Sequence, residues 1–589
     1  MVKHLFYLNK YFVKYKWRFL LGIGFVAASN YFGVLIPQQI RLALDYVSEQ
    51  IQLYKENPGS VVEGDINYVL LVFALTIIGF VIIKGVLMYA MRQTIIVMSR
   101  LIEYDLRNEV FSHLETLDLS FYKKNKTGDI MARISEDVNK VRMYLGPSVL
   151  YGINITTLFA LTIFAMFKVN STLALYTLLP LPLLSISIYV VSSMINKRSS
   201  LIQRQLSVLN STAQEVYSGI RVIKSYVKED QFAEYFKEQN EDFMGKSLSL
   251  ARINAFFFPL MILLISASTL LTIFIGGIQV SKGLATPGNI AEFVIYVNML
   301  TWPVTSIGWI ASLIQQAEVS QGRINELIET LPEITSNAKT DKPLNGHIIF
   351  KNVGFTFKES GIRALDNVNF ELIPGQKLAI VGKTASGKST IADLLLRQYD
   401  VTQGEILIDG KNIQDHDLYN LRRKIGYVPQ DVFLFSDTIA NNIKFGNNLA
   451  SDEEVMRYAD YASVHEDIME LPKKYDTMVG ERGVSLSGGQ KQRVSIARAF
   501  IKSPDIIIMD DSLSAIDTNT ENKILSYLEQ ALSKKTAIII THRIYNLLDF
   551  DKIIFLEDGV IKEDGTHEEL IQKGGLYADL YEQQNAIES

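Results

Sequence analysis

Hydrophobic residues are concentrated in the first 320 positions of the chain, where they form long runs almost without charge. Five charge-free runs occupy positions 19–40, 143–167, 169–194, 253–281 and 293–317, and a sixth, 67–91, contains only Lys84. A helix needs roughly 20 residues to cross a hydrocarbon core about 30 Å thick. Core helices of a water-soluble protein would instead carry charges on an outer face. The pattern therefore predicts six membrane-spanning helices. Lys84 is expected to extend toward an interface, with contact to a transported substrate as the alternative.

The connections between these runs predict their orientation and two cytoplasmic extensions. The external links 168–171 and 282–289 are short, whereas 92–142 and 196–252 are long and charged, as helices that project beyond the bilayer would be. Short helices are expected within them at 126–133 and 217–222. The N-terminal flank is basic and the loop after the first run is mainly acidic, which predicts a cytoplasmic N-terminus. The first run continues to Ile40 past its small residues, so we expect an uncleaved anchor rather than a signal peptide.

The remaining sequence alternates β-rich runs with helical patterns, which is typical of an α/β nucleotide-binding domain. A segment rich in Pro, Gly and polar residues separates it from the membrane half. We expect a transmembrane domain at 1–325, a linker at 326–345 and an ATP-binding domain at 346–589. The predicted fold class is an all-α six-helix membrane bundle fused to an α/β P-loop ATPase domain.

A phosphate-binding loop lies at positions 382–390, which read Gly-Lys-Thr-Ala-Ser-Gly-Lys-Ser-Thr. It fits G-x-x-x-x-G-K-[ST], follows an apolar strand and opens a helix, which is the context that this motif requires. Backbone N–H groups of such a loop surround phosphates at a helix N-terminus. Lys388 is expected to reach the β- and γ-phosphates of ATP, and the Ser389 hydroxyl to ligate Mg²⁺. The nucleotide-binding residues predicted in this loop are Gly382, Thr384, Ser386, Gly387, Lys388, Ser389 and Thr390.

Two further segments extend this chemistry. The apolar run 506–509 ends in Asp510, which is placed to hold Mg²⁺ in the manner of other P-loop NTPases. Positions 486–490 read Leu-Ser-Gly-Gly-Gln and open a predicted helix, which makes a second anion-receptive surface. One nucleotide needs only one such surface, so the second is expected to serve a nucleotide held by another subunit.

With these motifs in place, the whole chain resembles a half-transporter of the ATP-binding cassette (ABC) exporter type. The resemblance implies that Ser487, Gly488, Gly489 and Gln490 of the signature contact the nucleotide of the opposing subunit. It further implies a Mg²⁺-sensing glutamine at Gln430, a switch histidine at His542, a D-loop aspartate at Asp517 and an adenine-stacking aromatic at Phe357. Positions 480–483 resemble an exporter-specific loop, and Ala385 replaces a glycine that is common in the phosphate loop. The short segments at 126–133 and 217–222 would be coupling helices.

One position departs from the family pattern. Asp510 is followed by Asp511, where active members usually carry the glutamate that polarises the attacking water. A general base must lie within about 2.6–3.2 Å of its proton, directly or through one water, and aspartate is one methylene shorter. We therefore expect this site to bind ATP but to hydrolyse it slowly, which resembles the degenerate-site subunit of bacterial heterodimeric exporters. A homodimer in which Asp511 remains active is the alternative.

The amino-acid composition excludes several classes of function. The 589 residues contain no cysteine, which excludes thiol catalysis, zinc thiolate sites and a fused cysteine peptidase. The formal charge of −5 lacks the basic signature of nucleic-acid binding. The expected function is ATP-driven export of hydrophobic small molecules, such as drugs or lipids, across a bacterial cytoplasmic (inner) membrane, with the ATPase domain in the cytoplasm. The expected cofactors are ATP and Mg²⁺, and the expected partner is a second half-transporter. An ATP-gated channel or regulator is the rival class.

Overall fold

The computed structural model describes residues 3–56, 63–336, 343–480, 486–512, 520, 523–524, 526, 535–543 and 550–588. The chain forms two compact units. The first comprises Met1–Glu115 and Gly128–Thr330, and the second comprises Thr116–Thr127 and Leu331–Ser589. Residues 116–127, here called the inserted segment, thus pack with the C-terminal unit although they lie within the N-terminal half of the sequence.

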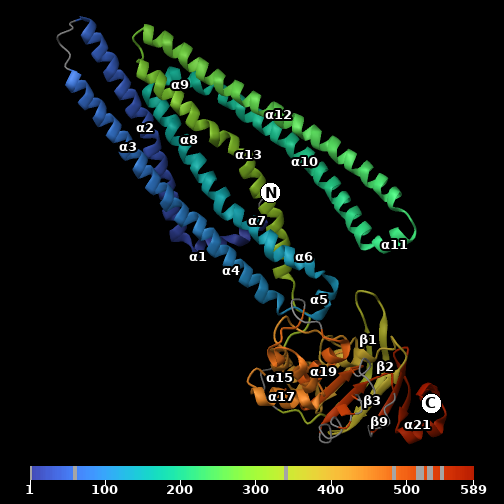
Figure 1. The fold of residues 1–589 in the computed structure, drawn as a ribbon. Coiled ribbons are helices and arrows are strands. Elements are labelled where there is room, and N and C mark those ends of the chain that lie inside the picture. The colour runs from blue at the N-terminus through green and yellow to red at the C-terminus, as the bar shows by residue number, and fades with distance from the viewer. Residues whose placement is uncertain are drawn as a thin grey trace. The chain divides into compact units, whose positions relative to one another are not determined.

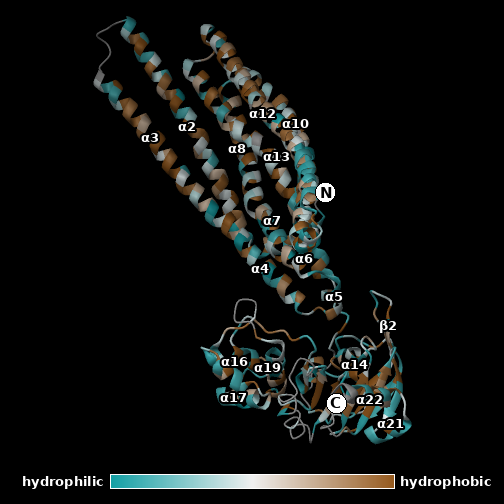
Figure 2. Ribbon diagram, turned by 45° about the vertical axis from the view of Figure 1, so that its right-hand side comes forward, coloured by the Kyte–Doolittle hydropathy of each residue, from teal (hydrophilic) through white to brown (hydrophobic). Residues whose placement is uncertain are grey.

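Among its described residues, the first unit contains six continuous helical stretches long and apolar enough to cross a membrane: Lys16–Glu56, Gly64–Leu114, Thr127–Val169, Ser171–Ser218, Glu229–Ser281 and Pro287–Glu329. Each contains one of the six apolar runs, so the predicted number of spans is confirmed. Figure 2 shows hydrophobic residues along most of α3 (Glu63–Met91) and more hydrophilic ones toward α4 (Val97–Leu114). The stretches are longer than a bilayer requires because their charged ends continue the helical backbone.

Local interruptions divide these stretches into shorter elements (Figure 1). Three π-helical turns, Arg92–Ile96, Arg133–Asp137 and Tyr144–Ser148, lie between α-helices of the second and third stretches. Pairs α2–α3 and α10–α12 run side by side. The other helices of this unit are α1 (Asn9–Lys14), α2 (Lys16–Glu56), α6 (Thr127–Ala132), α7 (Val138–Met143), α8 (Val149–Val169), α9 (Ser171–Leu178), α10 (Pro180–Ser218), α11 (Ile220–Ser225), α12 (Glu229–Ser281) and α13 (Pro287–Glu329), after a 3₁₀ turn at His4–Leu8.

Short helices lie at both predicted positions. Within the predicted 126–133, α6 (Thr127–Ala132) begins the third apolar stretch. A further short helix that the sequence did not reveal, α5 (Leu119–Lys124), precedes it. At the second position, α11 (Ile220–Ser225) begins after Gly219 and overlaps the predicted 217–222.

Lys84 does not lie at the end of its helix pair. A Cβ atom on Gly33 of α2 would come within 3.2 Å of the Lys84 ammonium, and one on Gly22 would meet Ile95. These contacts fix the antiparallel register of α2 and α3. By the 1.5 Å rise, Gly33 lies about 21 Å from position 19 and about 10 Å from Ile40. The half-buried ammonium thus packs against α2 within the apolar stretch 19–40, and its extension to an interface stays a prediction.

A second polar contact inside the bundle has no signal in the sequence. Glu292 precedes the sixth apolar run, and its side chain is fully buried. Its Oε2 lies 3.2 Å from Arg41 Nη1, and its Oε1 accepts a hydrogen bond of 2.8 Å from the Tyr296 hydroxyl. The pair joins α13 to α2, and the partner groups offset the cost of burying the carboxylate.

The second unit contains two β-sheets. The larger has the strand order β10-β9-β3-β8-β7-β6, and β9, β3, β8, β7 and β6 run parallel. The smaller is antiparallel with the order β2-β1-β4-β5. The α/β fold class is therefore confirmed. The strands are β1 (Ile348–Thr356), β2 (Arg363–Leu372), β3 (Lys377–Gly382), β4 (Gln403–Ile408), β5 (Lys411–Asn412), β6 (Ile425–Val428), β7 (Ile506–Asp510), β8 (Thr536–Ile540), β9 (Lys552–Glu557) and β10 (Val560–Gly565).

Helices cover these sheets and complete three apolar clusters among the described residues. Strands β7 and β8 are buried at every position, as their unbroken Ile-rich sequences require. One cluster lies between the two sheets, one lies beneath a helical subdomain, and a smaller one joins β3 and β9 to the C-terminal helices. The helices are α5, α14 (Lys388–Leu395), α15 (Leu418–Lys424), α16 (Ile439–Lys444), α17 (Asp452–Tyr461), α18 (His465–Glu470), α19 (Gly488–Phe500), α21 (His567–Lys573) and α22 (Leu576–Glu588).

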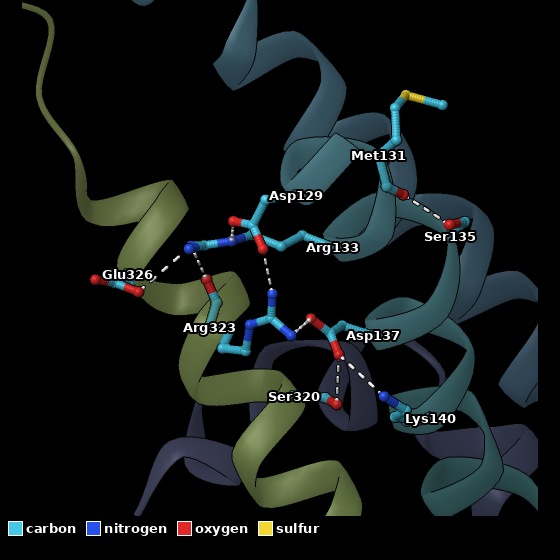
Figure 3. A network of polar contacts seen from close by, with 9 residues as sticks. All are labelled: Asp129, Met131, Arg133, Ser135, Asp137, Lys140, Ser320, Arg323 and Glu326. Atoms are coloured by element: carbon cyan, nitrogen blue, oxygen red, sulfur yellow. Dashed lines mark hydrogen bonds and ion pairs between the residues drawn. The ribbon is translucent and has the colours of Figure 1, made fainter. Parts of the chain in front are cut away.

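A buried carboxylate in the first unit joins the last long helix to the third stretch (Figure 3). Asp137 is 1% exposed. Arg323 Nη1 of α13 lies 3.2 Å from its Oδ2, and the Ser320 hydroxyl donates to its Oδ1 at 2.8 Å. Arg323 Nη2 also donates to Asp129 Oδ1 at 2.6 Å. The guanidinium therefore bridges two carboxylates and fixes α13 against α6 and the following π-helical turn.

Replacing Arg323 with Met should destabilise this unit, because the Asp137 carboxylate stays buried without its guanidinium. We expect a loss of about 2 kcal/mol, below the roughly 3–5 kcal/mol of a fully buried pair because Arg323 is partly exposed. The measurement is the thermal unfolding midpoint of the purified protein. Arg323→Met/Asp137→Asn should recover part of the loss. Lys237→Met breaks an exposed pair with Glu234 and should change stability by no more than about 0.5 kcal/mol. Equal unfolding midpoints for Arg323→Met and wild type would contradict the stabilising role assigned to the Arg323–Asp137 pair.

Candidate functional site

The candidate site lies where parallel strands of the larger sheet end at one edge. The carboxyl ends of β3, β6, β7 and β8 carry the phosphate loop, Gln430, the Asp510–Asp511 pair and His542, respectively. Open α/β sheets bind ligands at this edge. These segments surround one cavity of about 500 Å³. Its lining residues include the predicted Phe357, Thr384, Ser386, Gly387, Lys388, Ser389, Thr390, Gln430, Asp510, Asp511 and His542.

Glycine is required at two positions of the phosphate loop. Gly387 has φ +99° and precedes α14, and a Cβ there would collide with the Ala364 carbonyl oxygen. Gly382 has φ +150°, and a Cβ there would collide with the carbonyl oxygen of Leu556. Ala385, which replaces a family glycine, has φ +64°. That conformation costs a non-glycine residue roughly 1–2 kcal/mol, which the loop accommodates.

The loop offers polar groups that suit a polyphosphate. Lys388 Nζ donates to the carbonyl oxygens of Gly382 and Lys383 at 2.9 and 2.6 Å. Burial lowers the pKa of Lys388, an effect opposed by the charges of Asp511 and Asp510. The Ser386 hydroxyl is buried without a hydrogen-bond partner among the described residues, a costly state that a phosphate oxygen would relieve. These features fit a phosphate ligand.

The carboxylate pair follows β7 and lies beside the loop. Burial raises the pKa of Asp510, and a hydrogen bond to the Ser389 side chain opposes the rise. Asp511 Oδ1 lies 2.8 Å from His542 Nδ1, and its Oδ2 accepts a hydrogen bond of 3.4 Å from Gln430 Nε2. Asp511 has φ +46°, a conformation that aspartate tolerates better than most residues. Three residues predicted from distant motifs are thus brought into contact.

The predicted signature residues form a separate structure. Ser487 caps α19, because its hydroxyl accepts from the Gln490 N–H at 3.2 Å and the Gln490 side chain accepts from the Ser487 N–H at 3.0 Å. Gly488 and Gly489 follow in the first turn of the helix. None of the described residues lining the cavity comes from 487–490. Asp517 and positions 481–483 lie outside the described residues.

The cavity also includes residues that the sequence did not reveal. Arg363 and Ala364 of β2 line it, together with the preceding Ile362, and no motif connects these residues with the phosphate loop. Asp393 of α14 is half-buried, and burial raises its pKa to about 6, with Lys123 opposing the rise and Asp510 adding to it. Burial likewise raises the pKa of Tyr427. An acidic residue between apolar ones, in Ile-Ala-Asp-Leu-Leu at 391–395, was the available signal for Asp393.

The fold and this site together define a multi-pass membrane protein with a P-loop ATPase domain. The model of the ABC transporter transmembrane region matches residues 19–304, and the ABC transporter model matches residues 365–514. The chain belongs to the ABC transporter family, and it is an exporter-type ATPase that couples ATP hydrolysis to export. Exporters of this family function as dimers.

Several relatives span nearly the same length. The chain is 36% identical over 98% of its length to the probable multidrug resistance ABC transporter ATP-binding/permease protein YheI of Bacillus subtilis, and covers 97% of it. It is 34% identical, with 98% and 95% coverage, to the multidrug resistance-like ATP-binding protein MdlA of Escherichia coli. Among solved structures, a bacterial Atm1-family ABC exporter with ATP bound matches with a TM-score of 0.77 at 26% identity, with 98% of each chain covered.

Replacing Asp393 with Asn should stabilise the protein at neutral pH. The pKa of this carboxyl is about 6 in the folded protein and lower when unfolded, so the folded state binds the proton more tightly and stability falls as pH rises toward 6. Removing the charge should gain about 1–3 kcal/mol at pH 7.5 and less at pH 5. The measurement is the unfolding midpoint at both pH values. Glu470→Gln, at an exposed carboxylate, is the control and should show no such pH dependence. A gain in stability that is the same at both pH values would contradict the raised pKa of Asp393.

Proposed function

We propose that this chain is one subunit of a heterodimeric exporter of hydrophobic small molecules, in which its own phosphate loop binds ATP but hydrolyses it slowly. The observation that carries the proposal is the position of Asp511. Its short side chain ends in a carboxylate whose two oxygens are in contact with His542 and Gln430. A base in this position has limited reach toward a water, and loss of general-base catalysis typically costs about 10²–10⁴-fold in rate.

Binding of the nucleotide does not depend on that reach. Lys388 and the N–H groups of the loop 382–390 would hold the phosphates, and Phe357 would stack on the adenine. Ser389, Gln430 and Asp510 would hold Mg²⁺, whose charge supplies electrostatic stabilisation at the phosphates. His542 would contact the γ-phosphate. The unpartnered Ser386 hydroxyl and the buried Asp510 support a site that retains its ligand contacts.

The signature motif supports a role for the second subunit. Ser487, Gly488, Gly489 and Gln490 form the capped N-terminus of a 13-residue helix outside the chain's own cavity. The first turn of such a helix presents N–H groups and a favourable dipole to an anion. In the proposed dimer it completes the partner's competent site, and Asp517 contributes to the same interface. ATP-driven closure of the two ATPase domains then favours one orientation of the membrane helices, and hydrolysis resets it.

Hydrophobic small molecules, drugs or lipids, are the proposed substrates. The names of the YheI and MdlA relatives refer to multidrug resistance, which supports this class. Tyr31, Phe256 and Trp302 are each more than half exposed in the first unit and offer aromatic surface, although lipid contact explains such residues equally well.

One observation favours a homodimer as the second candidate. The 2.8 Å contact between Asp511 Oδ1 and His542 Nδ1 places a carboxylate and a histidine together at the cavity, as an active pair would be. If Asp511 activates the attacking water through one bridging water molecule, two copies of this chain could hydrolyse ATP without a second kind of subunit.

Lengthening the side chain at Asp511 should discriminate between these candidates. If the chain belongs to a heterodimer, it has little ATPase activity when purified alone. Asp511→Glu should then raise the ATPase rate by about 10-fold or more, and Asp511→Asn should leave that rate almost unchanged. The measurement is Mg²⁺-ATP turnover in lipid vesicles, with Lys388→Ala as the background control. A brisk wild-type rate that Asp511→Asn abolishes would contradict the heterodimer and support the homodimer.

The proposed location is the bacterial cytoplasmic membrane, with the N-terminus and the ATPase domain inside. Because the chain has no cysteine, single cysteines report this topology directly. In intact cells, with an outer membrane permeabilised where one is present, Lys55→Cys should react with an impermeant maleimide and Lys126→Cys should not. Both positions are exposed in the structure, so access rather than burial decides the result. After membrane disruption both should react, and the reverse pattern in intact cells would contradict the orientation.

A further inference from the structure

The inserted segment approaches the nucleotide cavity from behind one aromatic ring. The Lys123 ammonium, at the end of α5, lies 5.5 Å from the centroid of Phe357 and 5.1 Å from that of Tyr399. A cation within about 6 Å of a ring centroid is attracted by the negative face of the ring. Lys123 thus contacts the residue that is proposed to stack on the adenine.

Phe357 belongs to a cluster of three rings that leaves it between two cavities. Its centroid lies 4.8 Å from that of Phe355 and 5.6 Å from that of Tyr399, both in edge-on arrangements. The ring lines the 500 Å³ nucleotide cavity and also a second cavity of about 340 Å³. Asp118 and Ser120 of the inserted segment line only the second one. The segment therefore reaches Phe357 from the side away from the phosphate loop.

Other contacts hold the inserted segment in this place. The Asp118 carboxylate accepts hydrogen bonds from the backbone N–H groups of Glu333 and Ile334. Lys358, which follows Phe357, donates to Glu333 at 2.9 Å. The ammonium is thus presented by a segment that is tied to the chain next to the ring, rather than by a freely placed surface side chain.

Tyr399 is the second ring that the Lys123 ammonium contacts. The Tyr399 hydroxyl is buried without a hydrogen-bond partner in the described part of the chain. Ring packing and the Lys123 ammonium therefore position Tyr399, and Tyr399 in turn packs on Phe357. The charge of Lys123 also acts on Asp393 of α14, the helix that opens with Lys388.

We propose that Lys123 is a positioning residue for the nucleotide base: its ammonium holds the Phe357 ring so that the opposite face can stack on the purine. The inference rests on the proposed stacking role of Phe357. Linkage makes the effect reciprocal, because a nucleotide that favours the held ring also favours the docked inserted segment. This segment connects the second and third membrane-spanning stretches, so binding of the base would stabilise the docked position of that connection.

A double-mutant cycle on the full-length purified chain tests the proposal. Equilibrium binding is measured for Mg²⁺-ATP and for inorganic tripolyphosphate, which lacks a base. Lys123→Met should weaken ATP binding about two- to fivefold and leave tripolyphosphate binding unchanged. Lys123→Arg, which keeps the cation, should bind ATP like wild type. Lys124→Met, at the neighbouring exposed lysine, is the matched control and should also bind like wild type.

The Phe357→Ala background separates the two proposals. There, Lys123→Met should cause no further loss of ATP affinity, because the ring through which it acts is absent. Wild-type ATP affinity of Lys123→Met, an equal loss for ATP and tripolyphosphate, or a loss that persists in Phe357→Ala would each overturn the role of Lys123. Unchanged ATP affinity of Phe357→Ala alone would instead overturn the stacking role of Phe357. Lys123→Gln repeats the test should the Met variant aggregate.

Discussion

The convergence of parallel strand ends at one edge of the larger sheet is the constraint on which the site depends. Residues more than 100 positions apart in sequence, such as Lys388 and Asp511, line one cavity only because β3, β8, β7 and β6 run in the same direction. The same geometry points α14 and the loop before it at the ligand. The phosphate loop, the carboxylates and His542 thus inherit their positions from backbone hydrogen bonds between parallel strands, whereas Phe357 and Arg363 lie at strand ends of the antiparallel sheet.

The residues predicted to contact nucleotides lie on two separate surfaces of the second unit. The phosphate loop, the carboxylates and His542 share a cavity, whereas the capped helix that begins after Ser487 lies elsewhere in the same unit. In the proposed heterodimer, the shorter carboxylate at Asp511 would slow hydrolysis at this chain's own site, and the helix that begins after Ser487 would still serve the partner's site.

A different constraint acts on the membrane-spanning helices. The bilayer core offers no water to hydrogen-bond backbone N–H and C=O groups, so these groups must pair with one another within helices. Polar side chains buried between these helices then need partners. Glu292, which precedes the sixth apolar run, pairs with Arg41 of α2 and with Tyr296 of its own helix. Asp137, in the charged extension, pairs with Arg323 and Ser320 of α13. These contacts join α13 to distant parts of the first unit, so the helix that leads toward the ATPase domain is held by specific charge pairs as well as by apolar packing.

The sequence alone determined the six spans, the α/β class, and the loop, carboxylate and signature motifs, because each rests on local periodicity or on residues adjacent in the chain. It did not reveal α5 or the approach of Lys84 to Gly33, since helix register and the position of a turn depend on the neighbouring helix. Tertiary structure alone decided that Lys123 meets Phe357, that Arg363 lines the nucleotide cavity and that burial raises the pKa of Asp393. Such pairings join segments separated by long stretches of chain, and only packing determines which of them meet.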